Sequence, residues 1–343
     1  MSTILDDFMK KLIIQIPCWN EELNIAKTLQ LIPKKFEGID SVELLIIDDG
    51  STDDTETVVD RLIGEMPGAV SYVRQANKGA YGARNTGLDH ATGTYVAFFD
   101  SDDLWLPHHL ARCMAGLQAH PELDWVFGSC TRVEHATGRV VDENVFYVDG
   151  TPRPFLSLRT RRDGDLRIFD DPSGTECQIL HGFFCGLQNS VIHRRIFDGR
   201  RFHEQYRVCE DELFLIRVLA DGARLAYYLE PHVIYRMHEL NSSVSGVGQV
   251  DDKTLAIFRE LVDGFEELLR EVPLTARDRR AARRRLSREY FWHLGYHGLL
   301  PAGRRAEALL AYRQGIKAWP WDWGLWKTYV TTALRPSSRG AQA

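Results

Sequence analysis

The chain has 343 residues, of which 44% are hydrophobic, so it is long and apolar enough to build one large α/β domain with an appendage. Its formal net charge of −6 hides an asymmetry: residues 1–250 carry 25 Lys and Arg against 37 Asp and Glu, whereas residues 251–343 carry 17 against 11. The acidic first part argues against nucleic acid as a ligand, since affinity for a phosphate backbone comes from clustered Lys and Arg.

The six cysteines are scattered and show neither a Cys-x-x-Cys motif nor a pairing of Cys and His at zinc spacing, so we expect reduced thiols in the core. The first ten residues carry acids where a secretory signal would carry cations, and they lack its apolar centre. No uncharged apolar run approaches the roughly 18 residues that a membrane span needs. The sequence therefore predicts a cytoplasmic protein.

The first hundred residues alternate between apolar runs typical of buried strands and segments with helical apolar spacing. Strands are predicted at residues 11–16, 42–47, 69–73 and 95–99, and helices at residues 21–32, at residues 81–90 and after Asp53, where Asp53 and Glu56 are spaced as a capping box. Strict alternation at this spacing predicts a parallel sheet with right-handed crossovers.

The same signals predict the later elements. They are helices at residues 107–119, 210–220, 277–294 and 302–318 and strands at residues 125–127, 225–229 and 233–237. Residues 134–180, rich in Gly, Pro, Asp and Arg, are interpreted as a hairpin and loop region over one rim of the site. We expect an α/β domain over residues 1–250 and a helical region over residues 251–343.

The most informative segment is an apolar strand that ends in three acids, Asp100, Asp102 and Asp103. In open α/β sheets the ligand binds at the carboxyl ends of the strands, so these carboxylates stand where chemistry is usually done. Neighbouring acids repel one another unless a divalent cation lies between them and another anion, and oxygen ligands beside a diphosphate favour Mg²⁺ or Mn²⁺. The alternative is a solvated acidic loop that caps the helix after Pro107.

Residues 17–21 and 48–51 carry polar side chains at two more strand ends on the same rim. Trp19 can support a flat base, and Asp49 can accept a hydrogen bond from the imide N–H of uracil. A turn with a helix N-cap would explain Gly50 and Ser51 equally well. It does not explain two successive acids at the end of a buried strand.

Small residues fill the predicted third helix, within the run Asn77-Lys78-Gly79-Ala80-Tyr81-Gly82-Ala83-Arg84-Asn85-Thr86-Gly87. They allow the helix to approach the sheet closely, and Lys78 and Arg84 can balance diphosphate charge. The run is neither a Rossmann glycine fingerprint nor a Walker loop.

Taken together, four motifs closely resemble those of the family 2 inverting glycosyltransferases. They are Pro17-x-Trp19-Asn20-Glu21, Asp48-Asp49-Gly50-Ser51, Asn77-x-Gly79-x-x-x-Ala83-Arg84-Asn85-x-Gly87 and Asp100-x-Asp102-Asp103. Their order and spacing agree with the family, and the similarity covers about residues 11–245. The resemblance implies the GT-A fold, a Rossmann-like and mostly parallel sheet flanked by helices. Its nucleotide-sugar half would span about residues 11–130 and its acceptor half about residues 131–250, before the helical appendage.

The resemblance also implies roles for single residues. The nucleotide-sugar site would contain Pro17, Trp19, Asn20, Glu21, Asp49, Lys78, Gly79, Arg84, Asp100 and Ser101. Asp102 would coordinate Mn²⁺ or Mg²⁺. His238 would complete the metal site, although a lone histidine is more often structural.

Glu210 and Asp211 resemble the acidic pair on the acceptor side of the family, which makes Asp211 the base. The alternative is that they occupy the first turn of a helix, where the helix dipole favours acids. The implied reaction is a metal-dependent inverting transfer from a nucleoside diphosphate sugar to a hydroxyl of a lipid-linked or surface glycan precursor. Among the nucleotides, UDP is favoured.

Eight arginines lie between Arg270 and Glu289, and five of the eight tryptophans follow residue 290. Basic helices followed by interfacial aromatic residues predict peripheral contact with an anionic membrane, at the inner face of the plasma membrane. The alternative is that these helices pack against the acidic domain or a second subunit of a homo-oligomer.

Two other classes stay open, a sugar-1-phosphate nucleotidyltransferase and a catalytically silent nucleotide-sugar-binding protein. Nucleotidyltransferases of this kind carry a Gly-rich loop with Arg or Lys directly after the first strand, where this chain has Pro17-Cys18-Trp19-Asn20-Glu21. The intact Asp211 argues against the silent binding protein. The sequence leaves the sugar, the base and the acceptor undetermined.

Overall fold

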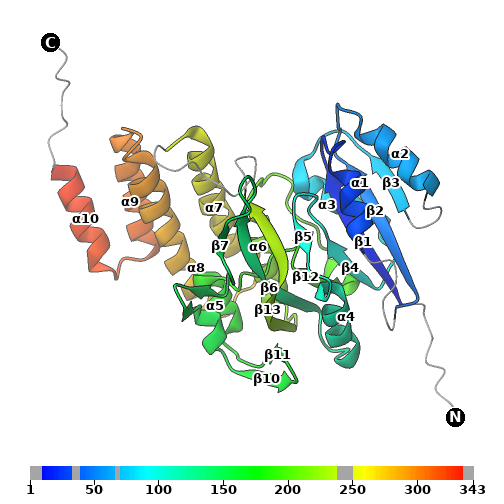
Figure 1. The fold of residues 1–343 in the computed structure, drawn as a ribbon. Helices are drawn as coiled ribbons and strands as arrows, with labels where there is room; N and C mark the ends of the chain where they lie inside the picture. The colour runs from blue at the N-terminus through cyan, green and yellow to red at the C-terminus, as the bar shows by residue number, and fades with distance from the viewer. Residues whose placement is uncertain (1–9, 33–38, 66–69, 238–249, 335–343) are drawn as a thin grey trace. The chain divides into compact units, whose positions relative to one another are not determined.

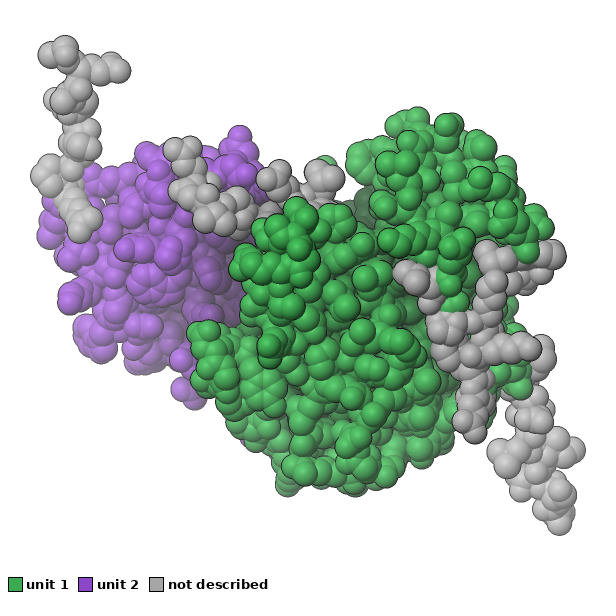
Figure 2. Space-filling view, in the orientation of Figure 1, with its two compact units in different colours: residues 1–241 green, residues 242–343 purple. Residues whose placement is uncertain are grey.

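The computed structural model describes residues 10–32, 39–65, 70–237 and 250–334 (Figure 1). The chain divides into two compact units, residues 1–241 and residues 242–343, which are coloured separately in Figure 2. Each unit has a hydrophobic core of its own.

The first unit begins with four strands joined by helices (Figure 1). The strands are β1 (Lys11–Cys18), β2 (Ser41–Asp48), β3 (Val70–Arg74) and β4 (Tyr95–Phe98), and the helices are α1 (Ile25–Leu31), α2 (Thr55–Glu65) and α3 (Gly79–His90). β1 pairs in parallel with β2 and β4, and β2 pairs in parallel with β3. The predicted alternation and parallel sheet are confirmed, so the carboxyl ends of these strands meet at one edge.

The rest of this unit extends the sheet beyond β4, through both parallel and antiparallel pairs. Its elements are β5 (Leu104–Trp105), α4 (His109–Ala119), β6 (Trp125–Glu134), β7 (Val140–Asp142), β8 (Tyr147–Val148), β9 (Thr151–Pro152), η1 (Pro154–Ser157), β10 (Thr160–Asp163), β11 (Leu166–Phe169), α5 (Gly174–His181), β12 (Ser190–His193), η2 (Arg194–Phe197), α6 (Glu210–Ala220) and β13 (Leu225–Met237). Within the described residues the main sheet has 11 strands, in the order β10-β11-β13-β6-β12-β4-β1-β2-β3 with β5 and β7 beside β13 and β6. β12 is antiparallel to its neighbours β4 and β6, whereas β6 and β13 are parallel.

Two predicted segments differ in detail. Residues 134–180, expected to be irregular, contain the short strands β7 to β11 and helix α5. The strands predicted at residues 225–229 and 233–237 form one strand, β13, whose register against β6 shifts on either side of Pro231. Because proline cannot donate to the ladder, it sits at a bulge that interrupts the apolar pattern without ending the strand.

Alternate residues of β1 pack on opposite faces of the sheet. Leu12, Ile14 and Ile16 belong to a core cluster that includes residues of α1, α2 and α4, whereas Ile13 belongs to a cluster that includes residues of α3 and α6. Helices therefore cover both faces, as a mostly parallel sheet requires. Full burial of each such side chain contributes about 1.5–3 kcal/mol relative to an exposed one.

Helix α3 approaches β1 closely at Gly87. A Cβ atom there would lie 2.0 Å from Nε2 of the buried Gln15, so the position needs glycine. Gln15 Nε2 donates a hydrogen bond of 3.1 Å to the main-chain oxygen of Arg84. The small residues of this motif thus fix where Arg84 lies relative to the strand ends.

The second unit is helical. Its elements are α7 (Asp252–Glu271), α8 (Ala276–Arg288), the π-helical segment η3 (Glu289–Leu299), α9 (Arg305–Ala318) and α10 (Trp323–Leu334). The rings of Phe291 and Tyr312 stack at 4.2 Å in its core. The helix predicted at residues 277–294 changes to π geometry at Glu289. Among the described helices, none combines the length and the apolar character that crossing a membrane demands.

Candidate active site

The loops after β1 and β2 are joined by hydrogen bonds. The main-chain nitrogen of Asn20 donates to Ser51 Oγ at 2.9 Å, and Asn20 Oδ1 accepts from the main-chain nitrogen of Thr52 at 2.8 Å. Asn20 has a φ of 57°, a left-handed conformation that asparagine adopts more readily than most residues. Next to it, Trp19 is 57% exposed and Pro17 is half-buried. The two loops form one platform at the carboxyl edge of the sheet.

Asp49, predicted to contact the base, holds the loop that leads into α3. Its Oδ1 accepts hydrogen bonds from Gln75 Nε2 at 2.7 Å and from the main-chain nitrogen of Lys78 at 2.8 Å, and its Oδ2 accepts from the main-chain nitrogen of Gly79 at 2.8 Å. A carboxylate has about four acceptor positions, so three bonds leave room for one more donor. The buried Asp49 therefore positions Lys78 and Gly79, and its contact with a base stays a prediction.

Glu21 connects the end of β1 to the acidic loop after β4. Its Oε1 accepts a hydrogen bond of 2.7 Å from Ser101 Oγ, and its main-chain nitrogen donates to Thr55 Oγ1 at 2.8 Å. Two residues assigned to the nucleotide-sugar site, Glu21 and Ser101, are thus in contact although 80 positions separate them in the chain.

Arg84 on α3 forms an ion pair with Asp100, the first acid after β4. Arg84 Nη2 lies 2.7 Å from Asp100 Oδ1, and Arg84 is only 8% exposed. Burial works against the guanidinium charge, but Asp100 outweighs it, and the net effect raises the pKa of Arg84. A buried, permanently charged guanidinium at the strand ends is suited to bind an anion such as a diphosphate.

Arg236, near the C-terminal end of β13, binds Asp102 and Asp103. The guanidinium group of Arg236 donates to the main-chain oxygen of Asp102, and the main-chain nitrogen of Arg236 donates to Asp103 Oδ1 at 3.0 Å. In the described part of the chain, the buried Asp103 Oδ2 has no hydrogen-bond partner. Burial, followed by the charges of Asp102 and Asp100, raises the pKa of Asp103 well above its usual range. His238, the other predicted metal ligand, lies outside the described residues.

The acids after β4 offer oxygen donors without meeting at one point. Across residues 10–32, 39–65, 70–237 and 250–334, no three carboxylates place ligand oxygens within 4.8 Å of one another. The half-buried Asp102 and the unpartnered Oδ2 of Asp103 fit a hard cation that takes only one or two ligands from the protein and the others from a diphosphate.

Helix α6 brings Asp211 to the same group of charges. Cys209, directly before the helix, has a φ of 59°, a conformation that costs energy for a residue with a side chain and often marks a functional site. Burial is the main cause that raises the pKa of Asp211, while Arg84 opposes the rise and Asp100 adds to it. The predicted base therefore lies within electrostatic reach of the Arg84–Asp100 pair, and its raised pKa suits proton abstraction.

Glu210 faces the interior. Its carboxylate is fully buried, and Oε1 accepts hydrogen bonds from the main-chain nitrogen of His203 at 2.8 Å and from the guanidinium group of Arg217. Burial raises the pKa of Glu210 to about 7, although Arg217 opposes the rise. These contacts hold the loop before α6 in place, and the catalytic role predicted for Glu210 stays a prediction.

Two residues of α3, Tyr81 and Asn85, link it to the acceptor side, and no role was predicted for them. Asn85 Oδ1 accepts from the main-chain nitrogen of Phe202 at 2.9 Å, and Asn85 Nδ2 donates to the Phe202 oxygen at 2.8 Å. The buried Tyr81 has a raised pKa because of burial and, secondarily, the charge of Asp211. The motif quoted around Arg84 pointed to these positions, but no sequence signal named partners 117 residues away.

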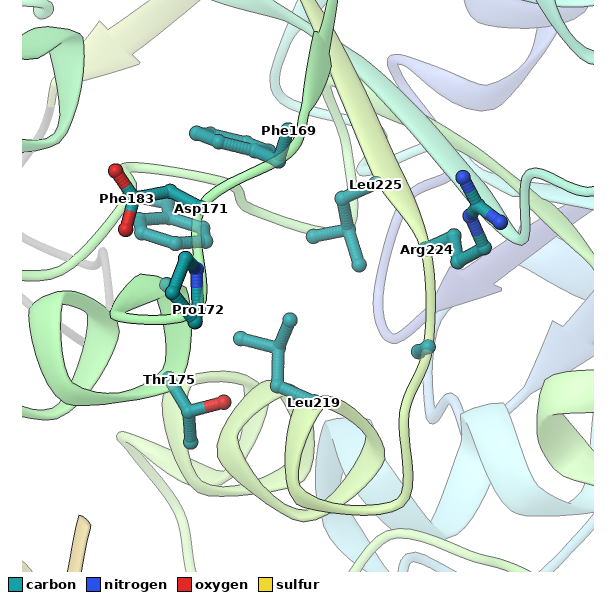
Figure 3. Close-up of a pocket in the computed structure, with 10 residues that line it drawn as sticks. Phe169, Asp171, Pro172, Thr175, Phe183, Leu219, Arg224 and Leu225 are labelled. Carbon is teal, nitrogen blue, oxygen red and sulfur yellow. The ribbon is translucent and has the colours of Figure 1, made fainter. Parts of the chain in front are cut away.

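A cavity of about 210 Å³ is lined by residues at the start of β13, near β11 and at the end of α6 (Figure 3). Its lining includes Leu225 at the start of β13, Leu219 near the end of α6 and the stacked rings of Phe169 and Phe183. Arg236, near the other end of β13, binds the acidic loop. The cavity is therefore separated from the acids by the length of the strand and is not the candidate active site.

The sequence of this chain is similar to those of known proteins. Residues 13–192, more than half of the chain, match the family model described as Glycosyl transferase family 2. The chain belongs to glycosyl transferase family 2. It is 32% identical over 263 residues to GalNAc(5)-diNAcBac-PP-undecaprenol beta-1,3-glucosyltransferase of Campylobacter jejuni, a match that covers 76% of each protein. Four other curated relatives are spanned over only 24% to 62% of their own length.

Two solved structures resemble this family 2 glycosyltransferase. S. aureus TarS 1–349, in complex with UDP-GlcNAc, matches with a TM-score of 0.60 and 17% identity over 90% of this chain and 81% of TarS. The mannosyltransferase PcManGT from Pyrobaculum calidifontis, in complex with GDP-Man and Mn²⁺, matches with a TM-score of 0.54 and 17% identity over 95% of this chain and 80% of its own. At such identities the likeness shows the fold, which confirms the predicted GT-A architecture.

Proposed function

We propose that this chain is a metal-dependent inverting glycosyltransferase that moves a hexosyl group from a UDP-sugar to a hydroxyl of a lipid-linked or surface glycan precursor. The observation that carries the proposal is that Asp211 lies within electrostatic reach of Arg84 and Asp100. A direct displacement needs a base on the acceptor side and charges that stabilise the leaving diphosphate on the donor side, and in this proposal Asp211 and Arg84 would supply them.

The relatives support the donor and acceptor classes. The C. jejuni relative is named for glucosyl transfer to GalNAc(5)-diNAcBac-PP-undecaprenol, and TarS was solved with UDP-GlcNAc. The choice of UDP rests on two observations. TarS was solved with a UDP-sugar, and one hydrogen-bond acceptor position remains on the Asp49 carboxylate, which suits the imide N–H of uracil. PcManGT, solved with GDP-Man and Mn²⁺, supports a divalent cation.

We assign the donor to about residues 11–130 and the acceptor to about residues 131–250. On the donor side Trp19 would stack on the base, and Arg84 would balance the diphosphate. Asp102, with His238, would hold Mn²⁺ or Mg²⁺, which supplies Lewis-acid stabilisation of the leaving group when bound.

Asp211 would accept the proton of the acceptor hydroxyl as its oxygen attacks the anomeric carbon from the face opposite the diphosphate. The bond between that carbon and the diphosphate oxygen breaks, and its electron pair leaves with UDP. Because attack and departure occur on opposite faces, the anomeric configuration inverts. Arg84 would stabilise the charge that develops on the departing diphosphate.

The reaction type is tested by its products. A thermal-shift screen of nucleotide sugars with Mn²⁺ identifies the donor, and turnover with polyprenyl-diphosphate-linked acceptors is followed by nucleotide chromatography and by NMR of the anomeric proton. We expect UDP and a product of inverted configuration. Release of pyrophosphate would favour a nucleotidyltransferase, binding without turnover would favour a silent binding protein, and retained configuration would contradict Asp211 as the direct base.

The metal is tested separately by calorimetry of UDP binding with and without Mn²⁺. We expect Mn²⁺ to strengthen binding in the wild type and to have no such effect in Asp102→Ala. The control is Asp60→Ala, since Asp60 is exposed on α2, outside the strand-end loops. Equal strengthening in both variants would remove Asp102 from the metal site.

We also propose peripheral contact of the second unit with an anionic membrane at its cytoplasmic face. Trp323 on α10 is 84% exposed, Trp321 just before it is 77% exposed, and Trp326 is also exposed. Aromatic rings with basic residues nearby in the chain bind at the headgroup level. In liposome flotation, a triple Trp→Ser variant at these positions should lose binding to phosphatidylglycerol vesicles, whereas Trp19→Ser should retain it. Unchanged flotation of the triple variant would contradict this surface.

A further inference from the structure

Three buried metal-ligating side chains meet behind the acidic loop. His109 is the first residue of α4, Cys113 follows one turn later on the same face, and His232 lies on β13; all three are 0% exposed. His109 Nδ1 lies 3.2 Å from His232 Nδ1, and Cys113 Sγ lies 3.8 Å from His109 Nδ1 and 3.6 Å from His232 Nδ1. These residues are used neither by the donor nor by the acceptor side of the proposed reaction.

The spacing of the three atoms fits a tetrahedral zinc ion. With Zn–N of about 2.05 Å and Zn–S of about 2.3 Å, ligand atoms in a tetrahedral site are separated by about 3.3 Å for two nitrogens and about 3.6 Å for nitrogen and sulfur. The observed separations differ from these values by about 0.2 Å at most. Two imidazoles and one thiolate are also ligands that Zn²⁺ prefers over Mg²⁺ or Mn²⁺.

The two histidines lie in a fully buried environment, close to one carboxylate. His232 Nε2 lies 3.7 Å from Glu230 Oε1, which in turn lies 3.0 Å from Arg112 Nη1. The distance from His232 Nε2 to Glu230 Oε1 is too long for a hydrogen bond, so Glu230 lies near His232 without orienting it.

We propose that His109 Nδ1, Cys113 Sγ and His232 Nδ1 bind one Zn²⁺ that fastens α4 to β13. Binding displaces the thiol proton to solvent and leaves a thiolate on the metal. The main-chain oxygen of His232 accepts a hydrogen bond of 2.9 Å from the main-chain nitrogen of Leu106, and β5 pairs with β13 beside it. The zinc would therefore anchor the segment that follows Asp103, without taking part in sugar transfer.

All six cysteines are free and five of them are buried, as the sequence predicted, and the proposal adds a metal-binding role for Cys113. His109 and Cys113 are four positions apart on a helix, but the third residue is 119 positions from Cys113 and leaves no local signal in the sequence. Only the pairing of β13 with β5 and β6 brings it within reach.

The test uses the full-length protein, stripped of metal by a chelator and reloaded with Zn²⁺ or Co²⁺. We expect one equivalent of zinc by mass spectrometry, a higher unfolding temperature with Zn²⁺ than with Mn²⁺, and the thiolate-to-cobalt absorption band with Co²⁺. A Co²⁺ complex without that band, or no zinc retained, would overturn the proposal in favour of a metal-free pair of buried histidines. A cation bound only by the acidic loop would give no thiolate band, so failure of this site and failure of the proposed function are distinguishable.

A matched pair of variants identifies the ligand. Cys113→Ser should weaken Zn²⁺ binding about 100-fold or more and abolish the thiolate band, since it removes one of three ligands. Cys177→Ser changes another buried thiol, on α5, and should leave both unchanged. Unaltered zinc binding in Cys113→Ser would refute the assignment. If Cys113→Ser does not fold, the Co²⁺ spectrum of the wild type still decides.

Discussion

Arg84 Nη2 lies 2.7 Å from Asp100 Oδ1, and this ion pair joins helix α3 to the loop after β4 at the carboxyl edge of the sheet. Both residues also act on the pKa of Asp211, in opposite directions, because α6 begins within their electrostatic reach. The pair therefore connects the side of the site assigned to the diphosphate with the side assigned to the acceptor.

Replacing Arg84 by lysine tests this connection. Arg84→Lys keeps the charge but loses the planar donor group, so we expect kcat/KM for transfer to fall about 10- to 100-fold, together with weaker UDP binding by calorimetry. Arg201 is the matched control, since it pairs with Asp89 on the exposed side of α3. An Arg84→Lys enzyme as active as Arg201→Lys would contradict the assigned role.

Replacing Asp211 by asparagine removes the proposed base while keeping its shape. We expect Asp211→Asn to lower kcat at least about 100-fold, the range of a lost general base, and to leave UDP affinity within about twofold. Asp221→Asn, at the other end of α6 and paired with Arg200, should behave like the wild type. Initial rates of UDP release check the prediction, and an active Asp211→Asn variant would require another base.

Replacing Asp49 by asparagine tests the loop that it holds. An amide can accept at only one of its two ends, so its NH₂ group would face a main-chain N–H of Lys78 or Gly79. We expect Asp49→Asn to lower the free energy of unfolding by about 2–3 kcal/mol, measured by urea titration, and to weaken UDP binding. The exposed Asp54→Asn should change stability by no more than about 0.5 kcal/mol. Equal stability of both variants would refute the structural role.

Glu210 predicts a pH dependence of stability. Burial raises its pKa in the folded protein from 4.5 to about 7, so between these values the folded state binds more protons than the unfolded chain. This group therefore lowers stability as pH rises from about 4.5 to 7, by at most about 3 kcal/mol. In Glu210→Gln this contribution should vanish, and in the exposed Glu65→Gln it should remain. Urea titrations across that window measure it; parallel pH curves for wild type and Glu210→Gln would contradict it.

Much of the fold could be predicted because its signals are local. The apolar runs and helical spacing of the first hundred residues gave β1 to β4 and α3 with ends shifted by only a few residues. The secondary structure of residues 134–180 could not be predicted in the same way. Strands of two to four residues, such as β8 and β10, have too short an apolar pattern to distinguish from a loop. The bulge at Pro231 hid the continuity of β13 for the same reason.

For the candidate site, too, some features could be predicted from the sequence and others could not. The sequence by itself determined the family, the parallel sheet and the residues that stand at its strand ends, because these depend on spacing along the chain. Only the tertiary structure decided what those residues contact. Asp49 binds a loop, Glu210 is buried, Asp211 lies near Arg84, and His232 meets Cys113. Such contacts depend on strand order and helix packing, which bring together positions about a hundred residues apart and leave no local mark in the sequence.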